Sequence, residues 1–181
     1  MISVLLGLGS NRTYGGKKPV ELLAAGCVEL KKVLRSPVFS RIYESRAMYV
    51  ENQDNFYNMA VKGCVEDSAD PFWLLNEIHK IENLFGRDRS KEIRFGPRPL
   101  DIDIEEFGSM KMNVAPDLIL PHPRIKERQF VLLPALEILN ENADEILRKQ
   151  FLSYLETLPD QGVCLCPEES QSLFKRLTLG G

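Results

Sequence analysis

The chain has 181 residues, of which 44% are hydrophobic and 27% charged, a composition typical of one folded domain with a substantial core. A formal net charge of −3 argues against a protein that coats nucleic acid, because such proteins carry an excess of Lys and Arg. No apolar segment approaches the ~20 residues needed to span a bilayer, and the N-terminus lacks the features of a signal peptide, so we expect a cytoplasmic protein.

The first third of the chain predicts a strand, a helix and two paired strands, in that order. Residues 3–9 form an apolar run that ends in Gly-Ser-Asn, which indicates a buried strand followed by a turn. Apolar side chains at helical spacing predict a helix over residues 19–34. Residues 38–49 and 56–65 are rich in β-forming residues, so we expect them to pair as neighbouring strands.

The second helix has the clearest signals in the sequence. Asp70 can cap its N-terminus, Pro71 occupies its first turn and Gly86 can end it. The apolar side chains between these boundaries form one core-facing stripe, namely Leu74, Leu75, Ile78, Ile81 and Phe85. A polar, basic loop over residues 87–97 and a strand over residues 100–107 follow.

The order strand, helix, strand, strand, helix, strand is that of a ferredoxin-like α+β fold, in which two helices pack on one face of an antiparallel sheet. Residues after Gly108 predict a loop and one or two further helices. We therefore expect a single domain over residues 1–181, with a core over about 1–138 and a C-terminal helical extension over 139–181.

Two carboxylates lie on the last predicted strand. Because side chains alternate along a strand, Asp101 and Asp103 point the same way, with Cα atoms ~7 Å apart. Their neighbours Leu100, Ile102 and Ile104 point the other way, into the core. Two carboxylates on one rigid face can hold one or two Mg²⁺ ions and leave positions for water and phosphate oxygens. An isolated Asp-x-Asp is more often only the polar face of a half-exposed strand.

A cationic loop directly precedes the carboxylates and favours the metal site. Its cations are Arg87, Arg89, Lys91, Arg94 and Arg98. Guanidinium groups suit bidentate contact with phosphate oxygens and stabilise the charge on a phosphoryl group in transit. The loop alone could be a solvated charged segment. The loop and the carboxylates together provide the cationic clamp and the metal that phosphoryl transfer needs.

Histidine and glycine motifs add less. His122, fixed between two prolines in a basic stretch, could hydrogen-bond a phosphate, although a structural role fits it equally well. The sequence has no glycine-rich P-loop, kinase glycine loop or Ser-His-Asp arrangement.

Several motifs, in order, resemble the family of 6-hydroxymethyl-7,8-dihydropterin pyrophosphokinases of the folate pathway. The matching pieces are Leu-Gly-Ser-Asn after the first strand, Phe56-Tyr-Asn58, Glu82 with Gly86-Arg87, Arg94-Phe-Gly-Pro-Arg98-x-x-Asp101-x-Asp103, and Pro-His122-Pro with Arg128-x-Phe130. The match covers residues 3–138, and Gly-Pro-Arg-x-x-Asp-x-Asp is its most specific part.

The resemblance implies a ferredoxin-like fold and transfer of the β,γ-pyrophosphate of ATP to the pterin hydroxymethyl group, leaving AMP. By motif position, Asp101 and Asp103 would bind two Mg²⁺ ions, and the catalytic set would be Arg87, Arg98, Asp101 and Asp103. The ATP-binding set would be Glu82, Arg89, Arg94, Arg98, Ile104, His122 and Arg128. The substrate-binding set would be Ser45, Phe56, Asn58, Phe95 and Phe130, in which Phe95 and Phe130 sandwich the pterin ring.

The chain departs from the family pattern at two places close to the predicted site. Arg46-Ala47 follows Ser45 where family members usually have prolines, and Glu105-Glu106 replaces an apolar pair. We expect one of the two glutamates to face a surface that is covered in other members, or one carboxylate to join the metal site.

The expected partners are the small molecules ATP and hydroxymethyldihydropterin, without nucleic acid or membrane, and we expect a monomer. The alternative hypothesis is a catalytically weak relative that binds nucleotide or pterin as a binding module. An RNA-binding ferredoxin-like domain is disfavoured, because the predicted sheet lacks the tandem aromatic residues on which RNA bases stack.

Overall fold

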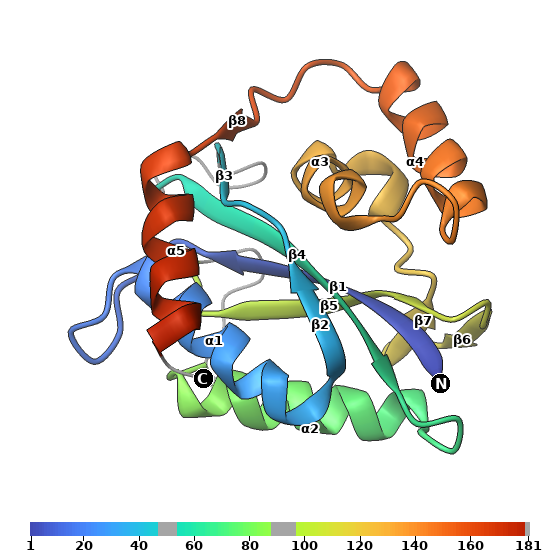
Figure 1. Ribbon diagram of the computed structural model, residues 1–181, viewed down its shortest axis with the longest axis horizontal. Helices are drawn as coiled ribbons and strands as arrows, with labels where there is room; N and C mark the ends of the chain where they lie inside the picture. The colour runs from blue at the N-terminus through green and yellow to red at the C-terminus, as the bar shows by residue number, and fades with distance from the viewer. Residues whose placement is uncertain (47–53, 88–96, 180–181) are drawn as a thin grey trace.

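The main sheet is antiparallel throughout, with β1 between β4 and β5 (Figure 1). The computed structural model describes residues 1–46, 54–87 and 97–179. The strands of this sheet are β1 (Ile2–Ser10), β2 (Arg35–Phe39), β3 (Tyr43–Ser45), β4 (Phe56–Val65), β5 (Asp101–Phe107) and β8 (Cys164–Leu165). Their order is β5-β1-β4-β3-β8, and β2 pairs with β4 next to β3.

The predicted strands are confirmed, except that the one over residues 38–49 is divided. Ser40 interrupts it, because its hydroxyl accepts a hydrogen bond from the Ala60 amide at 2.8 Å and donates one to the Arg41 carbonyl at 2.8 Å. The chain therefore leaves the ladder after β2 and joins it again as β3. Residues 47–53 lie outside the described part of the chain.

Helices α1 (Pro19–Val33) and α2 (Pro71–Leu84) cover one face of the sheet, as the sequence predicts. The predicted cap of α2 is present, since the Asp70 carboxylate accepts a hydrogen bond from the Phe72 amide at 2.6 Å. The predicted end is also present, because Gly86 has φ +84°, a left-handed conformation that favours glycine.

Helices also cover the opposite face, so the prediction of helices on one face is wrong. There α3 (Gln129–Ile138) and α4 (Glu145–Thr157) enclose a second core, while α5 (Pro167–Leu179) packs beside α1 on the first face (Figure 1). The reason lies in β1. Its neighbouring residues Leu5 and Leu6 point to opposite faces and are only 2% and 0% exposed, so both faces need a cover.

Short elements connect β5 to α3. They are a hairpin of β6 (Met112–Val114) and β7 (Leu118–Leu120) and a turn of 3₁₀-helix, η1 (Ile125–Glu127). The described part of the chain has three α-helices after Gly108, namely α3 within residues 120–138 and α4 and α5 after it. None of the helices in the described ranges is long and apolar enough for a bilayer span.

A bulge in β5 decides where the adjacent glutamates point. The pairing of β5 with β1 shifts next to Leu5, which lies opposite Glu106, so Glu105 is the extra residue of the strand. The Glu105 carboxylate lies over Gly7, on the same face as Leu5. Both glutamates therefore occupy the α3 face, and neither enters the core under α1 and α2. The sequence left open which surface each glutamate faces, and the register of β5 decides it.

Candidate active site

The two aspartates lie beside two glycines of the neighbouring strand. Asp101 and Asp103 pair across the ladder with Gly9 and Gly7 of β1, on the face opposite Ile102. Paired residues share a face, and glycine has no side chain, so β1 leaves room beside both carboxylates. The prediction that the aspartates share one face is confirmed, and the Gly-x-Gly of β1 gains a structural role that its sequence alone indicated only weakly.

Asp101 is held by the two arginines that flank the basic loop. Arg87 Nη1 donates to Oδ1 of Asp101, and Arg98 Nη1 donates to Oδ2. Burial alone would raise the pKa of Asp101, but the charges and hydrogen bonds of Arg87 and Arg98 outweigh it and lower the pKa below its ordinary value. Asp101 is therefore an anion fixed between two guanidinium groups.

The carboxylate of Glu82 supports the position of Arg87 beside Asp101. Its side chain is 0% exposed, and its Oε1 accepts hydrogen bonds from Arg87 Nη1 and, at 2.8 Å, from the amide of Ile102. Glu82 thus links the end of α2 to the beginning of β5 through a buried ion pair.

Asp103 faces a third arginine and a histidine. Arg128 Nη1 donates to Asp103 Oδ2 at 3.1 Å, and His122 Nε2 lies 3.9 Å from the same oxygen. Because His122 Nδ1 accepts a hydrogen bond from the Arg124 amide at 3.2 Å, the neutral ring carries its proton on Nε2, which faces the site. Burial lowers the pKa of His122, which favours this neutral form.

Two residues at the end of β1 fix the turn that carries Arg98. The Asn11 Oδ1 atom accepts from the Arg98 amide at 2.8 Å, and the Asn11 amide donates to the Arg98 carbonyl at 3.1 Å. Ser10 Oγ donates to the Pro99 carbonyl at 2.5 Å. Both side chains are buried, at 0% and 3% exposed for Ser10 and Asn11. The sequence marks this Ser-Asn pair as part of a motif but does not reveal that it holds Arg98.

Three residues predicted to bind the substrate lie together at the β3–β4 side of the same face. Asn58 is the ladder partner of Gly9, which itself pairs with Asp101, so Asp101 and Asn58 are two strands apart in one row. Asn58 Nδ2 donates to Ser45 Oγ at 2.9 Å, and the Phe56 ring lies beside Gly9. Neighbouring strands are about 4.8 Å apart, so the row from aspartate to asparagine spans about 10 Å, a length that suits a small molecule.

Phe130 closes the site from α3. The Arg128 guanidinium lies 5.7 Å from the centre of its ring, within the range of a cation–π contact. The ring is half-buried against the second core. The structure thus brings Phe130 next to the arginine that holds Asp103.

Four predicted site residues are not found at the surface of the site in the described part of the chain. Arg89, Arg94 and Phe95 lie outside the described residues. Ile104 is 4% exposed, and its side chain belongs to the core under α1 and α2, so only its main chain can lie near a ligand on the other face.

Glu105 lies beneath Asp103 and is the least expected member of the group. Its side chain is 1% exposed, and neither carboxylate oxygen has a hydrogen-bond partner among the described residues. His122 Nδ1 is 3.8 Å from Oε2, and a β-carbon on Gly7 would come within 2.8 Å of Oε1. Burial, together with the negative charge of Asp103, raises the pKa of Glu105 well above its ordinary value. Glycine at position 7 is what makes room for this carboxylate.

The buried carboxyl of Glu106 should make the free energy of unfolding depend on pH. It is 9% exposed, and burial raises its pKa from the model-peptide value of 4.5 to about 7. A carboxyl whose pKa is higher in the folded protein stabilises the fold at low pH, and this stabilisation is lost as the pH rises from about 4.5 through 7. We expect the free energy of unfolding to fall by about 2–3 kcal/mol between pH 5 and pH 8 because of Glu106 alone.

Urea unfolding at pH 5 and pH 8 tests this expectation. Glu106→Gln should remove that part of the pH dependence, while the part due to Glu105 remains and has the same sign. The exposed Glu156→Gln is the matched control and should behave as the wild type. An unchanged pH dependence in Glu106→Gln would contradict the assignment.

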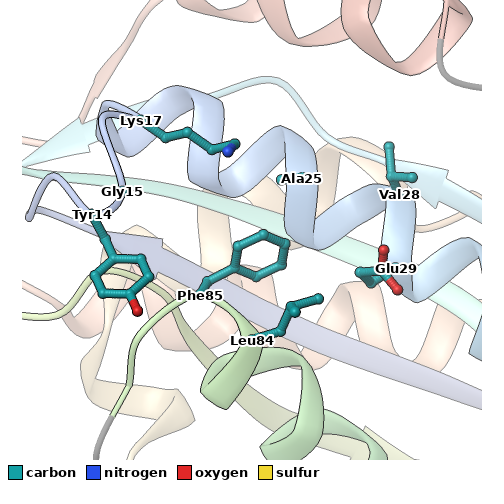
Figure 2. Close-up of a pocket in the computed structure, with 8 residues that line it drawn as sticks. All are labelled: Tyr14, Gly15, Lys17, Ala25, Val28, Glu29, Leu84 and Phe85. Atoms are coloured by element: carbon teal, nitrogen blue, oxygen red, sulfur yellow. The ribbon is translucent and has the colours of Figure 1, made fainter.

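A separate concavity of about 470 Å³ lies between the loop before α1, α1 itself and the end of α2. Figure 2 shows Tyr14, Phe85 and Leu84 along it, and none of its lining residues has a predicted role in the site. Its helices pack on the face of the sheet opposite the aspartates. We therefore assign it no part in the chemistry.

An antiparallel sheet with helices on both faces, carrying arginine-bound carboxylates on one face, defines the chain as an α+β protein with a charged surface site. The family model for 7,8-dihydro-6-hydroxymethylpterin-pyrophosphokinase (HPPK) matches residues 5–140. The chain belongs to the 7,8-dihydro-6-hydroxymethylpterin-pyrophosphokinase family. This confirms the resemblance inferred from the motifs.

Curated relatives agree with this assignment. The 2-amino-4-hydroxy-6-hydroxymethyldihydropteridine pyrophosphokinase of Bacillus subtilis is 39% identical over 134 residues, which are 74% of this chain and 74% of that protein. The folic acid synthesis protein fol1 of Pneumocystis carinii is 36% identical over 161 residues, which cover 89% of this chain and 21% of that protein. The chain spans 21% to 30% of the length of this relative and of two folate synthesis bifunctional proteins of Arabidopsis thaliana.

The fold is also shared with solved structures. The crystal structure of wild-type Plasmodium falciparum HPPK-DHPS matches with a TM-score of 0.56 over 86% of this chain and 45% of that one, at 17% sequence identity. At this identity the likeness concerns the arrangement of sheet and helices.

Proposed function

We propose that the chain transfers the β,γ-pyrophosphate of ATP to the hydroxymethyl group of 6-hydroxymethyl-7,8-dihydropterin and releases AMP, a step of folate synthesis. Family membership and the names of the relatives support this reaction. The observation that carries it in the structure is the row across the sheet. Asp101, fixed by two arginines, and Asn58, bonded to Ser45, lie on one face with only Gly9 between them.

The residues divide into a phosphate end and a pterin end. At the phosphate end, we propose that Arg98 and Arg87 stabilise charge on the transferred group, and that His122 and Arg128 bind phosphate oxygens of ATP through Nε2–H and the guanidinium. Arg89, Arg94 and the main chain of Ile104 complete the proposed ATP site. Glu82 is a positioning residue for Arg87, because its carboxylate is buried.

At the pterin end, we propose that the amide of Asn58 and the hydroxyl of Ser45 recognise the polar edge of the ring. Phe56 lies beside them, and Phe130 provides an aromatic face, with Phe95 as the second face of the sandwich. A flat heteroaromatic ring needs such faces together with a few polar groups at its rim.

The donor atoms fit magnesium. Mg²⁺ commonly binds one or two carboxylates and completes its shell with water and substrate phosphates. Asp101 and Asp103 offer carboxylate oxygens on one face, and the described residues form no cluster of three or more His, Cys, Asp or Glu side chains that would be an all-protein cage. We propose that the two aspartates hold two Mg²⁺ ions, whose chemistry is to neutralise and orient the phosphates of ATP.

Arg98→Ala should mainly slow the chemical step. Arg98 bonds to Asp101 through one guanidinium nitrogen, and its side chain is 22% exposed, so the group has donor capacity left for a phosphate. We expect kcat to fall by a factor equivalent to ~2–4 kcal/mol, as for the loss of one charge-stabilising donor. Steady-state kinetics against both substrates check this, and an effect confined to the pterin KM would mean that the role is misassigned.

The topology of the core and the domain organisation are also part of the proposal. The order of the first six helices and strands, with β2 and β3 counted as one interrupted strand, supports a ferredoxin-like core, and we propose that residues 1–181 form one domain. The monomeric state and the cytoplasmic location remain predictions from the sequence.

Product analysis tests the reaction. Purified protein with Mg-ATP should form AMP only when hydroxymethyldihydropterin is present. ADP as the product would indicate transfer of a single phosphoryl group. Binding of both compounds without turnover would favour the alternative of a catalytically weak binding module.

A further inference from the structure

The chain after residue 140, where the family match ends, touches both sides of the candidate site. In Figure 1 this tail leaves α4, runs above α3 and continues through β8 into α5, which packs beside α1. It bonds to the start of α3 and to β3, the two elements that carry the aromatic and the polar side of the proposed pterin site.

The first attachment is at α3. The side-chain oxygen Oε1 of Gln161 accepts a hydrogen bond from the backbone amide of Gln129 at 2.9 Å. In return, the backbone amide of Gln161 donates to Oε1 of Gln129 at 3.0 Å. Gln161 Nε2 also donates to the Glu127 carbonyl at 2.8 Å. The N-cap residue Arg128 makes no side-chain cap bond, so the tail supplies a partner for the first amide of the helix. These three bonds bracket Arg128 and adjoin Phe130.

The second attachment is at β3. The Ile42 amide donates to Ser170 Oγ at 2.9 Å, and the Ile42 carbonyl accepts from the Cys166 amide at 2.9 Å. The next residues of β3 pair with β8, as Tyr43 with Leu165. Ser170 is 3% exposed, so the hydroxyl is a buried partner for a buried amide. β3 is thereby held from both edges, by β4 and by β8.

We infer that Gln161 and Ser170 are positioning residues of this site, Gln161 for the Arg128–Phe130 segment and Ser170 for the strand that carries Ser45. Ser45 is three residues from Ile42 and bonds to Asn58, so a shift of β3 moves the polar side of the pterin site. The inference rests on the proposed function, because it takes these segments to be the walls of the substrate site.

Single alanine variants separate the two attachments. Ser170→Ala should raise the KM for hydroxymethyldihydropterin about fivefold, the equivalent of one hydrogen bond, and change kcat and the KM for ATP by less than about twofold. Gln161→Ala should raise the KM for both ATP and the pterin by a similar factor, because Arg128 and Phe130 move together. Gln150→Ala and Ser153→Ala are matched controls on the exposed side of α4, where both side chains bond only within the helix. They should leave all constants unchanged.

Amide hydrogen exchange gives a readout that does not depend on activity. Ser170→Ala should speed exchange in residues 42–45, and Gln161→Ala in residues 128–131. Faster exchange with unchanged KM values would make the tail merely structural and overturn the inference, as would unchanged exchange in both segments. If the wild type formed no AMP, the proposed function would fail, and the inference would then be decided by fluorescence titration of the pterin in the presence of a non-hydrolysable ATP analogue. Weaker pterin binding in both variants supports it, and unchanged binding overturns it.

Discussion

Asp103→Ala should abolish turnover and leave the fold intact. Asp103 is 37% exposed and contacts only Arg128 and His122 among the described side chains, so we expect unfolding free energy to change by about 1 kcal/mol or less. Its proposed role is to hold Mg²⁺ with the phosphates of ATP. Loss of that carboxylate should lower kcat by about 10³-fold or more, at least 4 kcal/mol of transition-state stabilisation.

Two companion variants sharpen the Asp103 experiment. Asp103→Asn keeps the shape of the side chain and one oxygen but removes the charge, and it should lose nearly as much activity as alanine. Asp117→Asn, at an exposed position before β7, should retain full activity. A near-normal rate in Asp103→Ala would show that the aspartate pair is only the polar face of a strand. Urea unfolding of each variant separates lost chemistry from lost structure.

Among the single variants proposed for the site, Glu82→Ala should lower the free energy of unfolding most. Its carboxylate is 0% exposed, pairs with the 4% exposed guanidinium of Arg87 and accepts from the Ile102 amide. Removing one partner of a buried ion pair costs about 3–5 kcal/mol, because the other charge stays buried. Activity should fall as well, because Arg87 is held by the carboxylates of Glu82 and Asp101 and would keep only the second.

The control for Glu82 lies on the same helix. Glu77 pairs with Lys80 at the surface, and Glu77→Ala should cost less than about 1 kcal/mol. Glu82→Gln keeps an acceptor for the Ile102 amide without the charge, so its stability should fall between that of the wild type and that of the alanine variant. Wild-type stability in Glu82→Ala would contradict the supporting role and return Glu82 to the list of direct ligand contacts.

Local patterns predicted the elements that depend on neighbours in the sequence. The Asp70 cap and the glycine at Gly86 bound α2 as expected, and strand alternation placed Asp101 and Asp103 on one face. Arg98, which follows the basic loop in the sequence, also lies beside Asp101. In each case the determining contacts lie within a few residues, so the sequence contains the information.

The failures depend on pairing over long distances. A bulge in β5 is a property of its register with β1, and no period in residues 101–107 shows it, so the sequence left the directions of Glu105 and Glu106 open. The second helical layer is needed because Leu5 is buried on one face of β1 and Leu6 on the other. A continuous apolar strand indicates that both faces are covered but does not prove it.

The supporting contacts of the site were equally hidden. Asn11 and Arg98 are 87 positions apart, and Ile42 and Ser170 are 128 apart. Glu82 was expected from the family motif at the ATP site, and its burial and its bond to Arg87 are visible only in the structure. Side chains that position others are determined by the tertiary structure, whereas the groups that carry the chemistry stand out by type and spacing.

Transfer of label from ATP tests the central proposal most directly. Protein is incubated with hydroxymethyldihydropterin, magnesium and ATP labelled in either the β- or the γ-phosphate, and the pterin product is isolated. Pyrophosphoryl transfer predicts that both labels enter the pterin in equal amounts and that all released nucleotide is AMP. Entry of the γ-label alone, with ADP as the nucleotide product, would contradict it.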